Sequence, residues 1–370
     1  MVMNYICVEC KSTFPLESHK WKCDCGGLLN LEYEKKLIDF NITSSSRNHS
    51  LWKYIDALPF NEEDVWQDVT MGEGDTPLIK LAENLYAKAE YYMPTLSFKD
   101  RGVAVLIAMA KKLGIDRVVA DSSGNAGSSI AAFGARAGIQ CDIFVADSTS
   151  DKKIKQIEAH GAVIHKIPGT REDVANAAIA MVEETNLFYA SHIYNPLFWE
   201  GTKTYVYEIY EQMDGQLPEA FIIPVGNGTL LMGAYIALQE LLENGQIDKM
   251  PKILAVQATA CAPIQKAFVD GSTVVDSVEN KGTLAEGIAI AAPARGAEIL
   301  KAVRATDGDI ITITDEETSE ARKELARKGV YVEITAAVNY AAYSRYIEKY
   351  PDLKNQKVVL PLCGAGIKSN

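Results

Sequence analysis

Short apolar segments alternate with longer amphipathic segments from about residue 100 onward, and this alternation constrains the fold more than any other feature. The pattern predicts strands at 117–120, 141–146, 162–167, 187–190, 221–225, 253–257 and 357–362. It predicts helices at 103–113, 127–137, 152–160, 172–184, 201–213, 230–243, 315–328 and 336–349. Strands and helices that alternate at this spacing are typical of parallel sheets covered on both faces. The sequence therefore predicts an α/β protein whose ligands bind where strands end and helices begin.

Composition and charge exclude several classes of protein. The 370 residues suffice for two or three domains, and the formal net charge of −12 disfavours a nucleic-acid partner, which requires a basic face. The longest apolar run, Val103 to Ala110, is far shorter than the ~20 residues of a membrane helix, and the N-terminus has no signal-peptide pattern. Seven cysteines, an odd number, fit a reducing cytoplasm better than a disulfide framework.

Four cysteines near the N-terminus have the spacing of a metal site. Cys7 and Cys10 form a C-x2-C pair, and Cys23 and Cys25 form a C-x-C pair followed by two glycines. Two thiolate pairs on tight turns can bind one zinc ion, and four protein ligands make such a site structural. The alternative is a ribbon-like module that folds without metal and uses its cysteines as small core residues. The polar segment 41–50 that follows is typical of a linker.

Three glycine-containing loops follow predicted strands, at 121–127, 225–229 and 362–366. Amides at the N-terminus of a helix bind phosphate or carboxylate groups, so three such loops suggest one shared anionic ligand. The loop at 225–229 has no lysine in P-loop register, which disfavours a Walker-type nucleotide site. No G-x-G-x-x-G motif follows the first strand, which disfavours a nicotinamide-dependent enzyme. The five histidines are scattered, and we expect most of them at the surface.

Lys99 lies at the start of the first predicted helix of this region. The positive end of the helix dipole lowers the pKa of a lysine amine and favours the neutral nucleophile that forms Schiff bases. The alternative is an exposed lysine paired with Asp100.

Motifs along nearly the whole chain match one enzyme family. They are Gly72–Leu78 (G-E-G-D-T-P-L), Ser97–Gly102 (S-F-K-D-R-G), Ser122–Asn125 (S-S-G-N), Asn195-Pro196 with Glu200–Thr204 (E-G-T-K-T), Pro224–Gly228 (P-V-G-N-G), Ala262–Ile264 and Ala285–Ala289. On these residues the chain resembles the pyridoxal-phosphate enzymes of the tryptophan-synthase-β type (fold type II), and most closely the threonine synthases. A cysteine-rich N-terminal module is also common among those relatives.

The resemblance implies a role for each matching residue. Lys99 would form the internal aldimine with pyridoxal 5'-phosphate and move the α-proton of the substrate. Asn125 would bind the phenolic oxygen of the cofactor, Cys363 would lie against its pyridine nitrogen, and Glu286 would line the ring edge. The amides of Gly226, Asn227, Gly228, Thr229 and Leu230 would hold its phosphate. The substrate would be held by Thr95, Ser122, Ser123 and Ala126. A neutral partner for the ring nitrogen suits elimination chemistry.

Several positions depart from the family pattern. Met93 and Leu96 stand where the family has asparagine and glycine, and Leu230 replaces an asparagine. The segment 333–337 reads E-I-T-A-A instead of E-P-T-S-A, and 363–366 reads C-G-A-G instead of T-G-H-G. Losing polar residues beside the site weakens the assignment of a doubly charged phosphate substrate and leaves the cofactor assignment almost unchanged.

The resemblance therefore predicts a cytoplasmic lyase acting on an amino acid, with threonine synthesis from O-phosphohomoserine as its first candidate reaction. The alternatives are a β-elimination or β-replacement enzyme, such as a serine or threonine dehydratase, and a non-catalytic homologue that binds the cofactor. We expect a homodimer with three regions. A cysteine module spans 1–35, a large cofactor-binding domain combines 36–104 with 201–370, and a smaller mobile domain spans 105–200.

Overall fold

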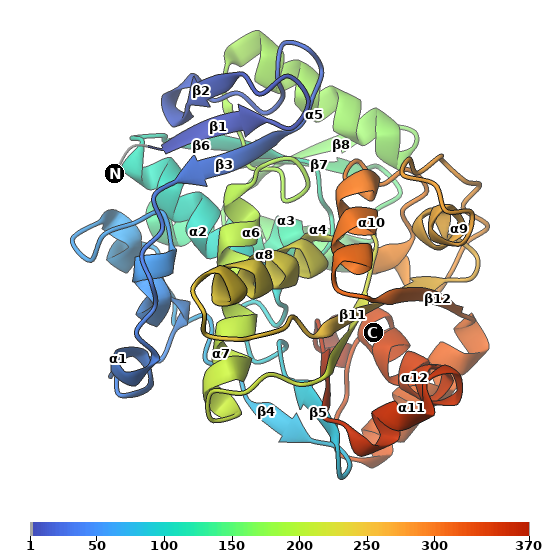
Figure 1. Cartoon of the computed structure of the whole chain (residues 1–370). Helices are drawn as coiled ribbons and strands as arrows, with labels where there is room; N and C mark the ends of the chain where they lie inside the picture. The colour runs from blue at the N-terminus through green and yellow to red at the C-terminus, as the bar shows by residue number, and fades with distance from the viewer. Residues whose placement is uncertain (1–2, 370) are drawn as a thin grey trace. The chain divides into compact units, whose positions relative to one another are not determined.

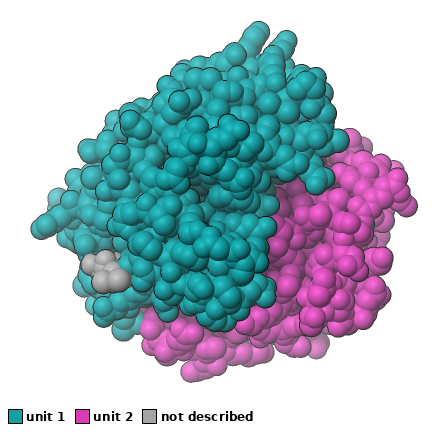
Figure 2. Space-filling model, turned by 90° about the horizontal axis from the view of Figure 1, so that it is seen from above, with its two compact units in different colours: residues 1–73, 99–202 teal, residues 74–98, 203–370 magenta. Residues whose placement is uncertain are grey.

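The computed structural model describes residues 3–369, and the chain divides into two compact units (Figures 1 and 2). Unit 1 combines Met1–Glu73 with Lys99–Thr202, and unit 2 combines Gly74–Phe98 with Lys203–Asn370. The division differs from the predicted regions, because 36–73 and 99–104 belong to unit 1. The helix that begins at Lys99 is almost wholly buried, and it packs against neighbouring helices of unit 1.

Unit 1 begins with a small antiparallel sheet. Its strands β1 (Met3–Cys7), β2 (Thr13–Pro15) and β3 (Leu29–Tyr33) lie in the order β2-β1-β3. Beyond it, the predicted linker at 41–50 contains part of a short helix, α1 (Phe40–Ser44), because the Asp39 carboxylate accepts a hydrogen bond from the Asn41 amide and caps the helix. The 3-10 turns η1 (Leu16–Ser18), η2 (Leu51–Ala57) and η3 (Val65–Asp68) complete this part of the chain.

The second sheet of unit 1 is parallel, in the order β8-β7-β6-β9. Its strands are β6 (Arg117–Ala120), β7 (Gln140–Ala146), β8 (Val163–Ile167) and β9 (Phe188–Tyr189). The helices of this region are α2 (Lys99–Lys112), α3 (Asn125–Ala137), α4 (Asp151–Glu158), α5 (Arg171–Thr185) and α6 (Leu197–Thr202).

Unit 2 contains a six-stranded sheet in the order β12-β11-β10-β13-β5-β4. Its strands are β4 (Leu78–Lys80), β5 (Leu85–Lys88), β10 (Ala220–Pro224), β11 (Lys252–Ala258), β12 (Asp309–Ile313) and β13 (Val358–Pro361). All neighbours are parallel except the edge pair β4–β5. The helices are α7 (Thr204–Gln212), α8 (Thr229–Glu243), α9 (Pro263–Val269), α10 (Gly296–Ala305), α11 (Asp315–Arg327) and α12 (Ile334–Lys349), with the 3-10 turns η4 (Glu286–Ile288), η5 (Pro351–Asn355) and η6 (Gly366–Ser369).

The predicted fold class is confirmed, since each unit has a largely parallel sheet and a cysteine-rich sheet stands at the N-terminus. The single helix predicted at 201–213 is wrong, because α6 and α7 are separate helices. The break lies where the chain passes from unit 1 to unit 2 at Lys203, whose buried amine pairs with Glu240 at 2.9 Å. Among the described residues, no helix has both the length and the apolar character needed to cross a membrane.

A buried ion pair anchors the segment 74–88 in unit 2. The Lys88 amine lies 2.7 Å from the Glu208 carboxylate, and both side chains are fully buried. Glu208 also accepts hydrogen bonds from the amides of Asp75 and Thr76, and Lys88 donates to the carbonyl of Thr76. Asp75 and Thr76 of the motif are thereby attached to α7, which carries Glu208.

Replacing Lys88 with methionine should strongly destabilise the protein, because it leaves the Glu208 carboxylate buried without its counter-charge. We expect Lys88→Met to lower the free energy of unfolding by about 3–5 kcal/mol in chemical denaturation. Lys323→Met, which breaks the exposed pair with Glu320, is the matched control and should change stability little. Equal losses in the two variants would contradict this role of the buried pair.

Candidate active site

Lys99 begins α2, and an aromatic ring lies beside its amine. The Nζ atom of Lys99 is 5.7 Å from the centre of the Phe198 ring, which α6 supplies. Two glycines allow the helices this close approach. A Cβ atom on Gly102 would lie 2.6 Å from the Phe198 ring, and one on Gly201 would lie 2.0 Å from the carbonyl oxygen of Arg101. The first turn of α2 is therefore packed directly against α6.

His192 belongs to the same cluster, although its sequence context gave no sign of this. Its side chain is buried, and its ring lies 5.9 Å from that of Phe198 in an edge-on arrangement. Burial lowers the pKa of His192 well below its usual value, and the positive charges of Lys99 and Arg171 lower it further. Most of the histidines were expected at the surface, and His192 is an exception that lies buried beside Phe198, the aromatic neighbour of Lys99.

The serine loop, residues 121–124, connects β6 to α3. Ser122 and Ser123 are half-buried in it, Asn125 is the first residue of α3, and Ala126 is buried behind it. The loop turns so tightly that a Cβ atom on Gly127 would lie 1.8 Å from the carbonyl oxygen of Ser122. The amides at the start of α3 have no partners within the helix and can bind an anionic group.

Hydrogen bonds connect α3 to the lysine helix and the serine loop to β9. Asp100, next to Lys99, accepts a hydrogen bond of 2.5 Å from Ser129 on α3. Tyr189 on β9 donates one of 2.7 Å to Asp121. Burial raises the pKa of Asp121, and burial together with this carboxyl group raises that of Tyr189. Unit 1 thus brings Lys99, Ser122, Ser123, Asn125 and Ala126 onto connected elements.

The phosphate loop, residues 226–230, connects β10 to α8 in unit 2. Gly228 has a φ of +75°, and a Cβ atom there would lie 2.4 Å from Ile299. On Gly226 a Cβ atom would lie 2.9 Å from Ile290. Both positions therefore require glycine. The loop leads into a 15-residue helix in which Thr229 and Leu230 are the first two residues, and amides at such a helix start can bind an anion.

The loop after β13 holds the segment that leads to Lys99. The amide of Phe98 donates to the carbonyl of Cys363 at 2.9 Å, and Ser97 forms a bridge with Gly364. Cys363 itself is buried. Since β13 pairs in parallel with β10, the Cys363 loop and the phosphate loop leave the same edge of the sheet. Unit 2 thus contributes two adjacent loops, one of which is bonded to the residue before the lysine.

The other residues singled out in the sequence are Thr95, Leu96, Met93 and Glu286, and each has a different environment. Thr95 is buried, and its carbonyl accepts a hydrogen bond of 2.7 Å from Lys368. Leu96 has a φ of +64°, a conformation that glycine adopts freely and leucine does not. Met93 is buried, and its sulfur accepts from the amide of Gly74. Glu286 is exposed at the start of η4, and Gly287 beside it donates to Thr335.

The four N-terminal cysteines converge on one point. The sulfur atoms of Cys7, Cys10, Cys23 and Cys25 all lie within 4.8 Å of one another, with Cys7–Cys25 and Cys10–Cys23 each at 3.5 Å. A Cβ atom on Gly27 would lie 2.6 Å from the Cys7 sulfur, so the second turn must carry glycine there. Four sulfurs at these distances suit one tetrahedral metal ion.

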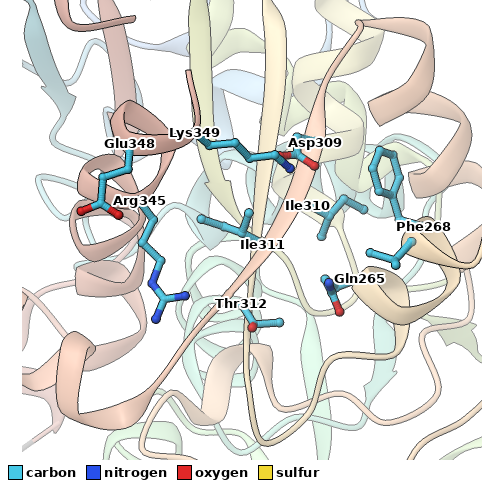
Figure 3. Close-up of a pocket in the computed structure, with 10 residues that line it drawn as sticks. Gln265, Phe268, Asp309, Ile310, Ile311, Thr312, Arg345, Glu348 and Lys349 are labelled. Atoms are coloured by element: carbon cyan, nitrogen blue, oxygen red, sulfur yellow. The ribbon is translucent and has the colours of Figure 1, made fainter. Parts of the chain in front are cut away.

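A surface pocket of about 770 Å³ in unit 2 contains none of the predicted site residues (Figure 3). It is lined by β12, α9 and α12, and its charged groups include mutually paired side chains. Lys349 contacts Asp309 at 2.6 Å, and Arg345 contacts Glu317 at 2.6 Å. We assign no ligand to this pocket.

Comparisons with known proteins agree with these features. The family described as "Pyridoxal-phosphate dependent enzyme" matches residues 69–364. The threonine synthase of Methanocaldococcus jannaschii is 31% identical over 375 residues, covering 98% of this chain and 92% of that protein. The threonine synthase of Methanosarcina acetivorans is 33% identical over 354 residues, covering 92% and 86%. A structure of processed threonine deaminase isoform 2 from Solanum lycopersicum has a TM-score of 0.69 at 24% identity, covering 82% and 81%. That likeness confirms the predicted fold class.

Replacing Gly127 with alanine should disrupt the serine loop, because the added methyl group would overlap the carbonyl of Ser122. We expect Gly127→Ala to lower the free energy of unfolding by about 1–3 kcal/mol in denaturant titrations. Gly124→Ala is the control, since a Cβ atom there meets nothing within 4 Å. If both variants are equally stable, the close contact does not constrain the loop.

Proposed function

The chain belongs to the pyridoxal-phosphate-dependent enzyme family and is a lyase of that family, and on this premise we propose that it is a threonine synthase. The reaction converts O-phosphohomoserine and water into threonine and phosphate. The observation that carries the proposal is the match to threonine synthases along nearly the whole chain.

The residues present fit pyridoxal phosphate. Gly226 and Gly228 pack against Ile290 and Ile299 and bring the backbone to the start of α8, where helix N-terminal amides suit a phosphate. We propose that residues 226–230 bind this phosphate and that Lys99 binds the cofactor covalently. Asn125, Cys363 and Glu286 would contact its ring. When bound, the cofactor supplies an electron sink for negative charge at the α-carbon of the substrate.

The surroundings of Lys99 suit it for proton transfer. Its amine lies against the Phe198 ring, and His192 beside that ring is neutral. The ring face attracts a protonated amine by a cation–π contact, so Phe198 can hold Lys99 in place once it has taken a proton. We propose that Lys99 takes the α-proton and returns it, while Ser122, Ser123, Ala126 and Thr95 hold the substrate carboxylate.

The proposal also includes a lid that closes over the substrate and a homodimeric enzyme. A lid that excludes water protects reactive intermediates, and we propose that the region 105–200 moves in this way. The resemblance to the family supports a cytoplasmic homodimer.

A second candidate is favoured by the apolar residues around the lysine. Phe198 lies against Lys99, and the neighbouring segment carries the apolar side chains of Met93 and Leu96. A doubly charged phosphate needs cationic and polar partners. These residues instead favour β-elimination or β-replacement on serine, threonine or a related unphosphorylated amino acid.

Four cysteine sulfurs within 4.8 Å of one another support a structural zinc ion. We propose that Cys7, Cys10, Cys23 and Cys25 bind it together, which leaves no open coordination position for catalysis.

Phosphate release distinguishes the two candidate reactions. We expect the cofactor-loaded protein to convert O-phospho-L-homoserine into equal amounts of phosphate and threonine, both measured in the same sample. Lys99→Ala should abolish turnover and the visible absorption of the lysine-bound cofactor. Lys111→Ala, at the far end of the same helix, is the matched control and should retain both.

The alternative outcomes separate the hypotheses. Cofactor absorption without phosphate release, together with turnover of serine or threonine, would support the second candidate. Turnover by Lys99→Ala would contradict the assignment of the lysine in both.

Elemental analysis tests the metal site. We expect about one zinc ion per chain and its loss in Cys10→Ser, because three thiolates bind zinc more weakly than four. Cys261→Ser, which removes a buried thiol of unit 2, should keep the metal. A folded N-terminal module that contains no metal would refute the site.

A further inference from the structure

We propose that the cysteine module, residues 3–33, positions the residues beside Lys99, and that Trp21 is the main positioning residue. The inference rests on the proposed function in taking Lys99 as the catalytic lysine, Ser122 and Ser123 as substrate-binding residues and the four cysteines as metal ligands. Its basis is a continuous set of contacts, all within unit 1, that leads from the cysteine cluster to the serine loop and to α6.

Trp21 connects the module to the parallel sheet. It stands two residues before Cys23 and packs against the buried cluster that includes Val119, Phe144 and Tyr189. Its ring makes edge-on contacts with Tyr189 at 5.8 Å and Tyr194 at 5.2 Å. In Figure 1 the small sheet lies next to the region of α5 and β6, in agreement with these contacts. The indole therefore belongs to the core of the neighbouring sheet.

From Trp21, contacts continue to the serine loop. The Tyr189 ring touched by Trp21 carries the hydroxyl group that donates to Asp121 at 2.7 Å. Asp121 immediately precedes Ser122 and Ser123. A shift of the indole would therefore be transmitted through one ring and one hydrogen bond to the proposed carboxylate-binding serines.

A second set of contacts leads from the module to α6. Tyr33, at the end of β3, donates a hydrogen bond of 2.6 Å to Glu200. A separate contact, from His19 to the carbonyl of Asn186 at 3.2 Å, reaches the C-terminal end of α5. Because α6 also carries Phe198, the module holds the helix that lies against the first turn of α2.

The module is too small to maintain this geometry through its own core. It has three short strands, and sheets of this size usually need a metal or disulfides to be stable. The turn that carries Cys23 and Cys25 begins two residues after Trp21. Binding of metal by the cysteines therefore fixes the backbone from which Trp21 projects, and we expect metal loss and loss of the indole to have similar effects on the lysine site.

The test uses the holoenzyme and a readout that needs no substrate. Visible circular dichroism of the lysine-bound cofactor reports its asymmetric surroundings. We expect Trp21→Ala to retain zinc and stoichiometric cofactor but to change this spectrum, and to lower kcat/KM by about tenfold or more, since small misplacements at a reacting centre have large effects on rate. Trp21→Phe should restore most of both. Removing zinc with a chelator should produce the same spectral change.

Matched variants separate positioning from general destabilisation. Trp66, which stacks on Trp52 at 5.1 Å, is another half-buried indole of unit 1, and Trp66→Ala should leave the cofactor spectrum unchanged. Tyr33→Phe removes the hydroxyl that contacts Glu200 and the carbonyl of Ala57, and it tests the second set of contacts if Trp21→Ala does not fold.

An unchanged spectrum in folded Trp21→Ala would overturn the proposal. If that variant does not fold, an unchanged spectrum in Tyr33→Phe would overturn it. An incorrect substrate assignment would not produce this result, because the spectrum is recorded without substrate.

Discussion

The close packing of α6 against the first turn of α2 is the contact on which the candidate site depends. Gly102 and Gly201 have no side chains where the helices meet, so Phe198 reaches the amine of Lys99. Asp100 continues the connection through Ser129 to the helix that Asn125 begins. The first turn of α2 therefore holds Lys99 against Phe198 of α6, and Asp100 connects the same turn to α3. Neither glycine is one of the candidate site residues, yet the two together set how closely α6 approaches Lys99.

The loops of unit 2 are arranged by a different principle. The strands β10 and β13 are parallel neighbours, so the loops that follow them leave the same edge of the sheet. One loop ends in the amides at the start of α8, and the other bonds the backbone of Phe98 through Cys363. Lys99 is the next residue after Phe98. Backbone groups therefore set the position of the chain before the lysine, while side-chain packing in unit 1 sets the position after it.

Local patterns in the sequence predict the elements of this fold well and their long-range contacts poorly. The glycine loops and Lys99 were identified because strand, turn and helix signals are short-range. His192 and Phe198 were missed because an isolated histidine and an apolar residue in a helix have the same local pattern at the surface, in a core or beside a catalytic group. Trp21 was missed for the same reason, since its partners Tyr189 and Tyr194 lie far away in the chain. The helix break at Lys203 was invisible because both flanking segments favour helix.

Leu96 stands where the related family has glycine, and its backbone conformation bears on that difference. Its φ of +64° is the conformation a glycine would adopt freely, and the related family has glycine at this position. A left-handed conformation costs a non-glycine residue roughly 1–2 kcal/mol and persists only when the surroundings impose it. The hydrogen bonds from Ala365 to the Leu96 carbonyl and from Leu96 to Met93 impose it here. The backbone path is therefore retained while an apolar side chain, 38% exposed, has been added three residues before Lys99. Position 96 therefore combines a backbone conformation typical of glycine with an apolar side chain close in sequence to Lys99.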